Sequence, residues 1–193
     1  MKYGNNKNQH MKSVAEIMYA NAPALGLSEE TAYVVGLLHD VGYIRSKDNH
    51  EVNGAEILKE MGFKDEYCDA IKYHNRNGYD LLREGIEITP MMMLLQFADM
   101  SVDKFGNTVG FDKRLVDLND RYRYGSPIYH NVIAQQEFLQ KVFNLHHLNR
   151  EEQLKPISKQ EFDRRVQTIK EQEHIIPNQD SKSEEQDLSE IEL

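Results

Sequence analysis

The sequence has 193 residues, of which 39% are hydrophobic and 28% are charged. A chain of this length and composition can bury a core of its own, and it predicts one soluble globular domain. The net charge is −9, from 32 acidic and 23 basic side chains. This acidic excess argues against broad binding to nucleic acids or to membrane surfaces.

The chain has a single cysteine, Cys68, so no disulfide can form within it, which suits a reducing compartment. No apolar run approaches the ~20 residues that a membrane span needs. The first residues, Met1 to Asn8, lack the apolar core of a signal peptide. We therefore expect a cytoplasmic protein.

Apolar residues at helical spacing predict helices along most of the chain. The first helix is expected over residues 8–24, where Pro23 helps to end it. The second is expected over residues 28–41, with Ser28 as its N-cap and Gly42 as its stop. This second helix is apolar on almost every side, so we expect it to be central and buried.

A third helix is expected to begin near Asp48, because Asp48 and Glu51 have the spacing of a capping box, and Gly62 marks its end. A fourth is expected from Asp65, as its cap, to a point ahead of Gly78. The buried face of the third helix is predicted to carry Val52, Ala55, Leu58 and Met61.

Thr89-Pro90 reads as an N-cap followed by proline at the first helical position, which predicts a largely apolar helix to Met100. Residues 101–125 are the least regular part of the sequence. Helices are predicted again over residues 127–148 and from Ser158 to about residue 174.

No segment shows a clean two-residue alternation, so the predicted fold class is all-α. Residues 177–193 are polar and acidic, without periodic apolar residues. They predict a disordered tail behind a single domain over residues 1–176.

Two aspartates stand in unusually apolar surroundings. Asp40 follows His39 at the end of the second predicted helix, and Asp99 lies within the apolar run 94–100. A buried carboxylate or imidazole loses hydration energy unless a partner compensates, and a metal ion is the usual compensation. Adjacent helical residues point ~100° apart, so both can bind one ion only where the chain turns, and Gly42 supplies that turn.

Three histidines on other predicted helices are further candidates: His10, His50 and His74. Each of these helices has an apolar face, and a helical bundle brings such faces together.

In order and in context, these residues resemble the HD-domain metal-dependent phosphohydrolases. Residues 36–42, Gly-Leu-Leu-His-Asp-Val-Gly, look like the central signature of that family, and Phe97-Ala98-Asp99 resembles its last ligand motif. His10 precedes both in the expected order. His50 and His74 match the two extra histidines of the binuclear subgroups.

The resemblance implies a five-helix core around a metal centre, with additional helices toward the C-terminus. It implies two divalent transition-metal ions, with iron or manganese as the first candidates and zinc, cobalt or nickel as alternatives. Asp40 would bridge the two ions and serve as the catalytic carboxylate. The implied ligands are His10, His39, Asp40 and Asp99 on one ion, and Asp40, His50 and His74 on the other.

The implied activity is hydrolysis of a phosphate ester or anhydride bond in a small nucleotide, by a hydroxide that the ions hold. The pattern looks closest to the symmetrical dinucleoside tetraphosphate hydrolases, so a dinucleoside polyphosphate is one candidate substrate. His50 follows Asp40 by only ten positions, which is a shorter interval than that subgroup leads us to expect.

Basic side chains near the ligands, or in the irregular segment after Asp99, are candidates for holding the substrate phosphate: Arg45, Lys72, Arg76, Lys104 and Arg121. Two alternatives stay open, because a fold does not fix a substrate. One is a mononuclear nucleotidase or a deoxynucleotide triphosphohydrolase on the same scaffold. The other is a non-catalytic module that senses nucleotides.

Overall fold

The computed structural model describes residues 3–145 and 157–174. These residues contain nine α-helices and two short 3-10 helices. Within these ranges the only β-pairing is an isolated bridge between Val102 and Thr108, so the predicted all-α class is confirmed. The elements in chain order are α1 (Tyr3–Asn21), η1 (Pro23–Leu25), α2 (Glu29–Leu38), η2 (Val41–Ile44), α3 (His50–Glu60), α4 (Asp65–Lys72), α5 (Gly78–Arg83), α6 (Pro90–Met100), α7 (Phe111–Arg121), α8 (Pro127–Phe143) and α9 (Lys159–Gln172).

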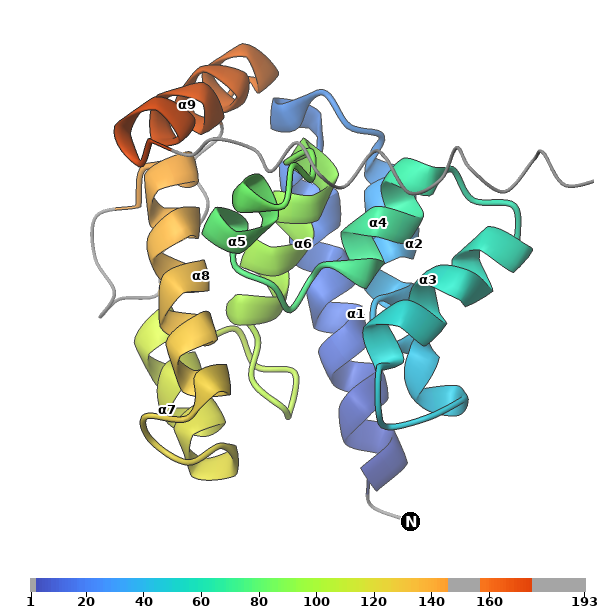
Figure 1. The fold of residues 1–193 in the computed structure, drawn as a ribbon. Helices are drawn as coiled ribbons and strands as arrows, with labels where there is room; N and C mark the ends of the chain where they lie inside the picture. Colours follow the sequence, from blue (N-terminus) through green and yellow to red (C-terminus); the bar gives the residue numbers. More distant parts are fainter. Residues whose placement is uncertain (1–2, 146–156, 175–193) are drawn as a thin grey trace, which may run out of the picture.

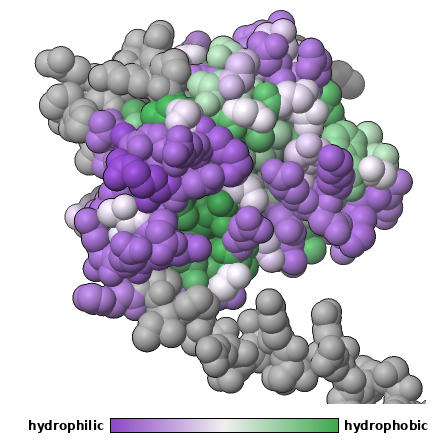
Figure 2. Space-filling model, turned by 90° about the horizontal axis from the view of Figure 1, so that it is seen from above, coloured by the Kyte–Doolittle hydropathy of each residue, from purple (hydrophilic) through white to green (hydrophobic). Residues whose placement is uncertain are grey.

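Helix α6 is the centre of the bundle, and all of its residues are buried. It packs against α1, α2, α4 and α8 (Figure 1). Helix α1 also lies along α2, and α3 packs on both α4 and η2. In the view from above, hydrophilic residues form most of the surface, and hydrophobic residues show in a hollow between them (Figure 2).

Three predicted helix starts are confirmed by their caps. The side chains of Ser28, Thr89 and Ser158 each accept a hydrogen bond from a backbone N–H three residues later. Such a cap stabilises a helix by about 1 kcal/mol, because it satisfies an N–H that has no partner within the helix.

The predicted capping box of Asp48 and Glu51 is wrong. Helix α3 begins at His50, and its cap, Asn49, has left-handed backbone angles (φ 55°) and makes no side-chain capping bond. Asparagine tolerates this conformation, which turns the chain sharply into α3. The Glu51 carboxylate instead accepts a hydrogen bond from Asn75 at 2.7 Å.

The predicted buried face of α3 is only half right. Ala55 and Leu58 are buried, but Val52 and Met61 are 42% and 59% exposed. Residues three apart drift around a helix that has 3.6 residues per turn, so a long series at this spacing leaves the buried face.

Several helix boundaries differ from the prediction. Helix α2 ends at Leu38, and α4 has Asp65 as its first residue and ends at Lys72. His74 therefore lies beyond α4, in the connection to the short helix α5, which the sequence did not predict. Helix α8 ends at Phe143, ahead of the predicted end at residue 148.

Helix α7 was also missed, because its many charges obscure an apolar face. Phe111, Leu115 and Leu118 have helical spacing and pack against the core. The predicted tail, 177–193, lies outside the described residues. Among the described helices, none is both long and apolar enough to cross a membrane.

Gly42 allows η2 to pack closely on α3. A Cβ atom at this position would lie 1.8 Å from the carbonyl oxygen of His50 and 2.6 Å from the amide nitrogen of Gly54. Both are backbone atoms that cannot turn aside as a side chain can, so only glycine fits here.

Gly42→Ala should therefore lower the free energy of unfolding by about 3 kcal/mol, because α3 must move away. For a chain of this size the melting temperature should fall by roughly 6–12 °C, as measured by circular dichroism. Gly54→Ala is the control, because the nearest atom to its added Cβ would be a side-chain carbon of Ile71, at 3.0 Å, and the nearest backbone atom would lie 3.5 Å away. An equal loss in both variants would contradict the prediction.

Candidate metal centre

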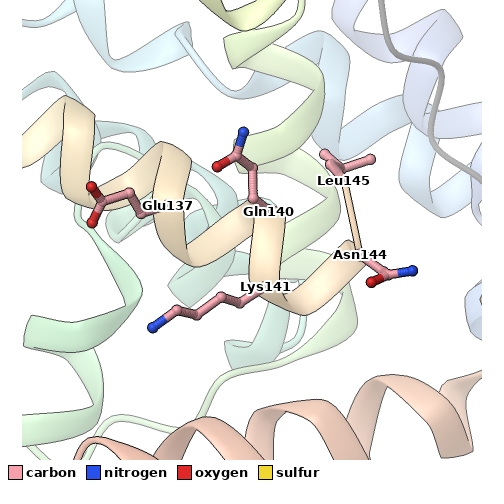
Figure 3. Close-up of a pocket in the computed structure, with 5 residues that line it drawn as sticks. All are labelled: Glu137, Gln140, Lys141, Asn144 and Leu145. Carbon is pink, nitrogen blue, oxygen red and sulfur yellow. The ribbon is translucent and has the colours of Figure 1, made fainter. Parts of the chain in front are cut away.

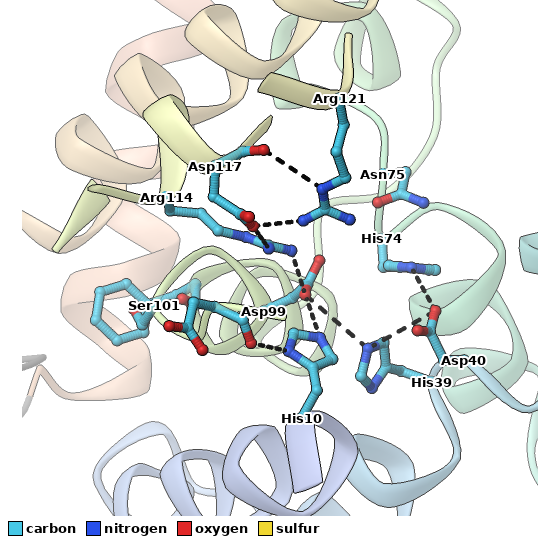
Figure 4. A network of polar contacts seen from close by, with 12 residues as sticks. His10, His39, Asp40, His74, Asn75, Asp99, Ser101, Arg114, Asp117 and Arg121 are labelled. Carbon is cyan, nitrogen blue, oxygen red and sulfur yellow. Dashed lines mark hydrogen bonds and ion pairs between the residues drawn. The ribbon is translucent and has the colours of Figure 1, made fainter. Parts of the chain in front are cut away.

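The structure brings the six predicted ligand side chains together in two groups. Figure 4 shows the site without His50 labelled. The six side chains come from several parts of the chain: His10 from α1, His39 and Asp40 from the connection between α2 and η2, His50 from the start of α3, His74 from the chain after α4, and Asp99 from the last turn of α6.

The side chains form two groups of three, in each of which the possible ligand atoms all lie within 4.8 Å of one another. We call His10, His39 and Asp99 the first trio. The second trio consists of Asp40, His50 and His74.

One carboxylate oxygen organises each trio. Oδ1 of Asp99 lies 3.0 Å from Nε2 of His10 and 4.0 Å from Nε2 of His39. Oδ1 of Asp40 lies 3.4 Å from Nε2 of His50 and 4.0 Å from Nε2 of His74. The same Asp40 oxygen is 3.8 Å from Nε2 of His39, so Asp40 lies between the two trios.

Backbone carbonyls orient three of the four imidazoles. Nδ1 of His39 lies 2.7 Å from the carbonyl oxygen of Gly36, and Nδ1 of His74 lies 2.6 Å from that of Ile71. His10 has the equivalent contact with the carbonyl of Asp103, at 2.9 Å. A carbonyl can only accept, so each Nδ1 carries the proton and donates. At His39 and His74 this leaves the lone pair of Nε2 for the centre, whereas Nε2 of His10 lies within hydrogen-bonding distance of Asp99, at 3.0 Å.

His50 is held differently. Its Nδ1 lies 3.3 Å from a carboxylate oxygen of Glu51, and its ring stacks on Tyr43 with the ring centres 4.0 Å apart. The carboxylate takes the place of the carbonyl and again leaves Nε2 directed at Asp40.

These contacts leave imidazole lone pairs and carboxylate oxygens facing one another, which is a set of electron donors that a cation would satisfy. Nitrogen and carboxylate ligands suit divalent transition metals, and orienting partners on the far ring nitrogen are typical of metal-binding histidines. The residues present therefore fit a divalent ion in each trio.

Burial and charge act in opposite directions on the carboxylates. Burial alone would raise the pKa of Asp40, but His39, His50 and His74 together hold it below its usual range. Burial also opposes ionisation of Asp99, yet the His10 hydrogen bond and the Arg114 charge keep its pKa well below the ordinary value. Both side chains are therefore ionised at neutral pH.

The pKa values of the two histidines of the first trio shift in opposite directions. Burial lowers the pKa of His39 and so favours its neutral form, which is the form that binds metals. At His10 burial also opposes the charge, but the hydrogen bond and charge of Asp99 outweigh it and raise the pKa of His10.

Arg114 is one of the basic side chains that the sequence places after Asp99, but its pairing with Asp99 was not predicted. Its Nη2 lies 3.3 Å from Oδ1 of Asp99, and its Nη1 donates to Asp117 at 2.9 Å. The residue is only 6% exposed, and among the described residues its Nε has no hydrogen-bond partner. The available signal was its place three residues after Phe111, on the inward face of α7.

The five basic side chains predicted to hold phosphate lie in different surroundings. Lys104 and Arg121 both pair with Asp117, at 3.4 and 2.5 Å, next to Arg114 and the first trio. The other three have partners elsewhere: Arg45 pairs with Glu56 and Glu60, Arg76 pairs with Glu84, and Lys72 lies over the ring of Tyr73. A role in substrate binding stays a prediction for all five.

A surface pocket lies away from these groups, at the C-terminal end of α8 (Figure 3). It is lined by Glu137, Gln140, Lys141, Asn144 and Leu145, none of which belongs to either trio.

Comparison with known proteins finds one family model that matches part of the chain. The family model described as HD domain matches residues 8–100, a range that contains every member of both trios. Residues 8–100 are therefore similar to an HD domain, over just under half of the chain. Arg114 and the rest of α7 follow this range, so a helix outside the matched part of the chain contributes to the surroundings of the centre.

Curated relatives named Ribonuclease Y match part of the chain. That of Thermosipho melanesiensis is 31% identical over 126 residues, which are 61% of this chain and 23% of the relative. Those of Fervidobacterium nodosum and Fusobacterium nucleatum are 38% and 33% identical, over 38% of this chain and 15% of each relative.

The chain thus spans less than a quarter of the length of these relatives. No solved structure matches the chain. None of the relatives named above is a dinucleoside tetraphosphate hydrolase, so that finer resemblance stays a prediction.

Arg114→Gln should destabilise the protein by about 3 kcal/mol in the presence of a chelator, because it removes the guanidinium that faces the buried Asp99 charge and detaches α7. Urea unfolding followed by circular dichroism measures this loss. Arg121→Gln is the matched control, since its partner is also Asp117 but the pair is more exposed. It should cost less than about 1 kcal/mol. Equal losses would show that α7 does not depend on the contact with Asp99.

Proposed function

We propose that this protein is a metal-dependent phosphohydrolase that cleaves a phosphate ester or anhydride bond of a nucleotide. The proposal depends on the two trios. The Nδ1 atom of each imidazole has a partner outside the centre, and the trios contain two ionised carboxylates, Asp40 and Asp99. The HD domain over residues 8–100 supports the same class of reaction.

The proposed cofactors are two divalent transition-metal ions, one held by each trio, with iron or manganese as the first candidates. When bound, such ions activate water as a nucleophile and neutralise the charge of the phosphate. The residues of the chain would then have to position the substrate and exclude water from the centre. The buried rings of His39 and His74 restrict access to the centre from within the bundle, since each residue is only 1% exposed.

The chain's own residues would orient the substrate. Asp40 lies between the trios and keeps their separation fixed through contacts with both. Arg121 and Lys104 lie beside the first trio, where a cation would hold a phosphate oxygen for attack. In Figure 4 the guanidinium of Arg121 lies on the side of the network that carries His74 and Asn75.

The substrate class has two candidates. A small nucleotide, with a dinucleoside polyphosphate among the possibilities, suits the acidic net charge of −9. The Ribonuclease Y relatives favour a second candidate, the phosphodiester bond of an RNA strand. Assays with diadenosine tetraphosphate, deoxynucleoside triphosphates, nucleoside monophosphates and a short RNA would separate these.

Two other proposals on the same scaffold make different predictions. A mononuclear nucleotidase would hold one ion and use His50 and His74 for other purposes. A non-catalytic sensing module would bind nucleotides without cleaving them, but the complete ligand set argues against it.

Metal content tests the binuclear proposal. Protein purified without chelator and without oxygen should contain about two transition-metal ions per chain by elemental analysis, and His10→Ala and His50→Ala should each lose about one. His130→Ala is the control, because His130 is exposed and belongs to neither trio. About one ion in the unchanged protein, with no loss in His50→Ala, would favour the mononuclear alternative.

Asp40→Asn tests the catalytic role. The change removes the charge between the trios but keeps the size of the side chain, and should lower kcat/KM by at least about a hundredfold. Hydrolysis of bis(p-nitrophenyl) phosphate by the metal-loaded protein measures it. Asp163→Asn, on the exposed side of α9, should leave the rate unchanged. Full activity of Asp40→Asn would exclude the proposed centre.

A further inference from the structure

Arginine and tyrosine alternate where α7 ends, in the order Arg121, Tyr122, Arg123 and Tyr124. All four residues are exposed. Tyr122 is 38% and Tyr124 is 74% exposed, so neither ring is used to build the core. Aromatic rings beside cations are the combination that binds nucleotides, because every base has a face for stacking and every nucleotide has a phosphate.

The backbone presents these side chains outward. Helix α7 ends at Arg121, and Tyr122 leaves it with extended angles (φ −120°, ψ 126°). The chain then turns through Gly125, at φ 74°, into α8. Tyr124 has a neighbour on this side, since its ring centre lies 4.8 Å from that of Tyr129. The segment is thus a defined turn between two helices.

A chain of polar contacts connects this segment to the centre. Asp99 of the first trio contacts Arg114, Arg114 contacts Asp117, and Asp117 contacts Arg121 (Figure 4). The segment is therefore connected to the candidate ligand Asp99 through Asp117 and Arg114. A base bound here would belong to a nucleotide whose phosphate lies at the centre.

Tyr43 places a second aromatic group at the centre, stacked on His50 of the second trio.

The charges are complementary to a nucleotide. Arg121 has a carboxylate partner in Asp117, but among the described residues no ion pair or hydrogen bond engages the guanidinium of Arg123. In a protein of net charge −9, an exposed cation between two exposed tyrosines favours a small anionic ligand over a long polyanion.

We propose that residues 121–124 bind the nucleoside part of the substrate: Tyr122 and Tyr124 stack on its base, and Arg121 and Arg123 hold phosphate oxygens. This inference rests on the proposed function and adds the residues that recognise the base. The shared ligand chemistry is a nucleobase next to a phosphate, whether it comes from a free nucleotide or from the end of an RNA strand.

The kinetic test compares two esters of the same chromophore, thymidine 5′-(p-nitrophenyl phosphate) and bis(p-nitrophenyl) phosphate, of which only the first has a base. Tyr122→Leu and Tyr124→Leu in the metal-loaded protein should each raise KM for the thymidine ester about tenfold, with kcat within twofold. KM for the base-free ester should not change. Tyr122→Phe should retain the original KM, because a phenyl ring stacks as a phenol does.

Tyr19→Leu is the matched control, since Tyr19 is a 43% exposed tyrosine outside the segment. It should leave both esters unaffected. If the tyrosine variants change KM for both esters equally, or for neither, the base-binding role is overturned while the hydrolase proposal stands.

A binding measurement keeps the inference testable if neither ester is cleaved, which would count against the proposed function alone. Isothermal titration of the protein with adenosine 5′-monophosphate and with ribose 5-phosphate, with metal and with chelator, should give tighter binding of the nucleotide. Tyr122→Leu should remove that difference. Equal affinities for the two ligands in the unchanged protein would overturn the inference.

Binding of an oligoadenylate of ten nucleotides distinguishes a free nucleotide from an RNA strand as the source of the ligand. If it binds no tighter than adenosine 5′-monophosphate, the segment recognises one free nucleotide. If it binds at least tenfold tighter, and Tyr122→Leu weakens both, the base belongs to an RNA strand.

Discussion

The charge of Asp99 is the constraint on which the rest of the site depends. This carboxylate lies in a helix whose every residue is buried, where an unpaired charge would cost several kcal/mol. His10 reaches it from α1, Arg114 from α7, and His39 lies at the edge of the same group. Compensating one buried charge thus brings three separate elements to one point, and a metal ion would complete what these contacts begin.

Much of this arrangement could be predicted from the sequence, because chemistry and periodicity agreed. A buried His-Asp pair before a glycine, and an aspartate inside an apolar helix, indicated the ligands before any contact was known. The caps at Ser28 and Thr89 fixed two helix starts in the same way. Each of these signals is local, so a single sequence carries it in full.

What the sequence could not predict depends on contacts between distant residues. The capping box at Asp48 was plausible locally, but Glu51 contacts His50 and Asn75 instead, and Asn75 is distant in the sequence. Helix α7 was missed because its charges have partners that only the fold reveals: Arg114 pairs with Asp99, which belongs to another helix. Tertiary pairing of this kind converts an apparently polar, irregular segment into part of a buried site.

The carbonyls behind His39 and His74 are those of Gly36 and Ile71, in the last turns of α2 and α4, and each accepts a hydrogen bond from the imidazole N–H. Each histidine therefore closes the end of the helix that precedes it and faces the centre with the opposite edge of its ring. Turning either ring away from a bound ion would break this closure and fray the helix end. Exchange of a bound ion with solvent would thereby be coupled to local unfolding of these two helix ends, so its rate would follow the amide hydrogen exchange of the same turns.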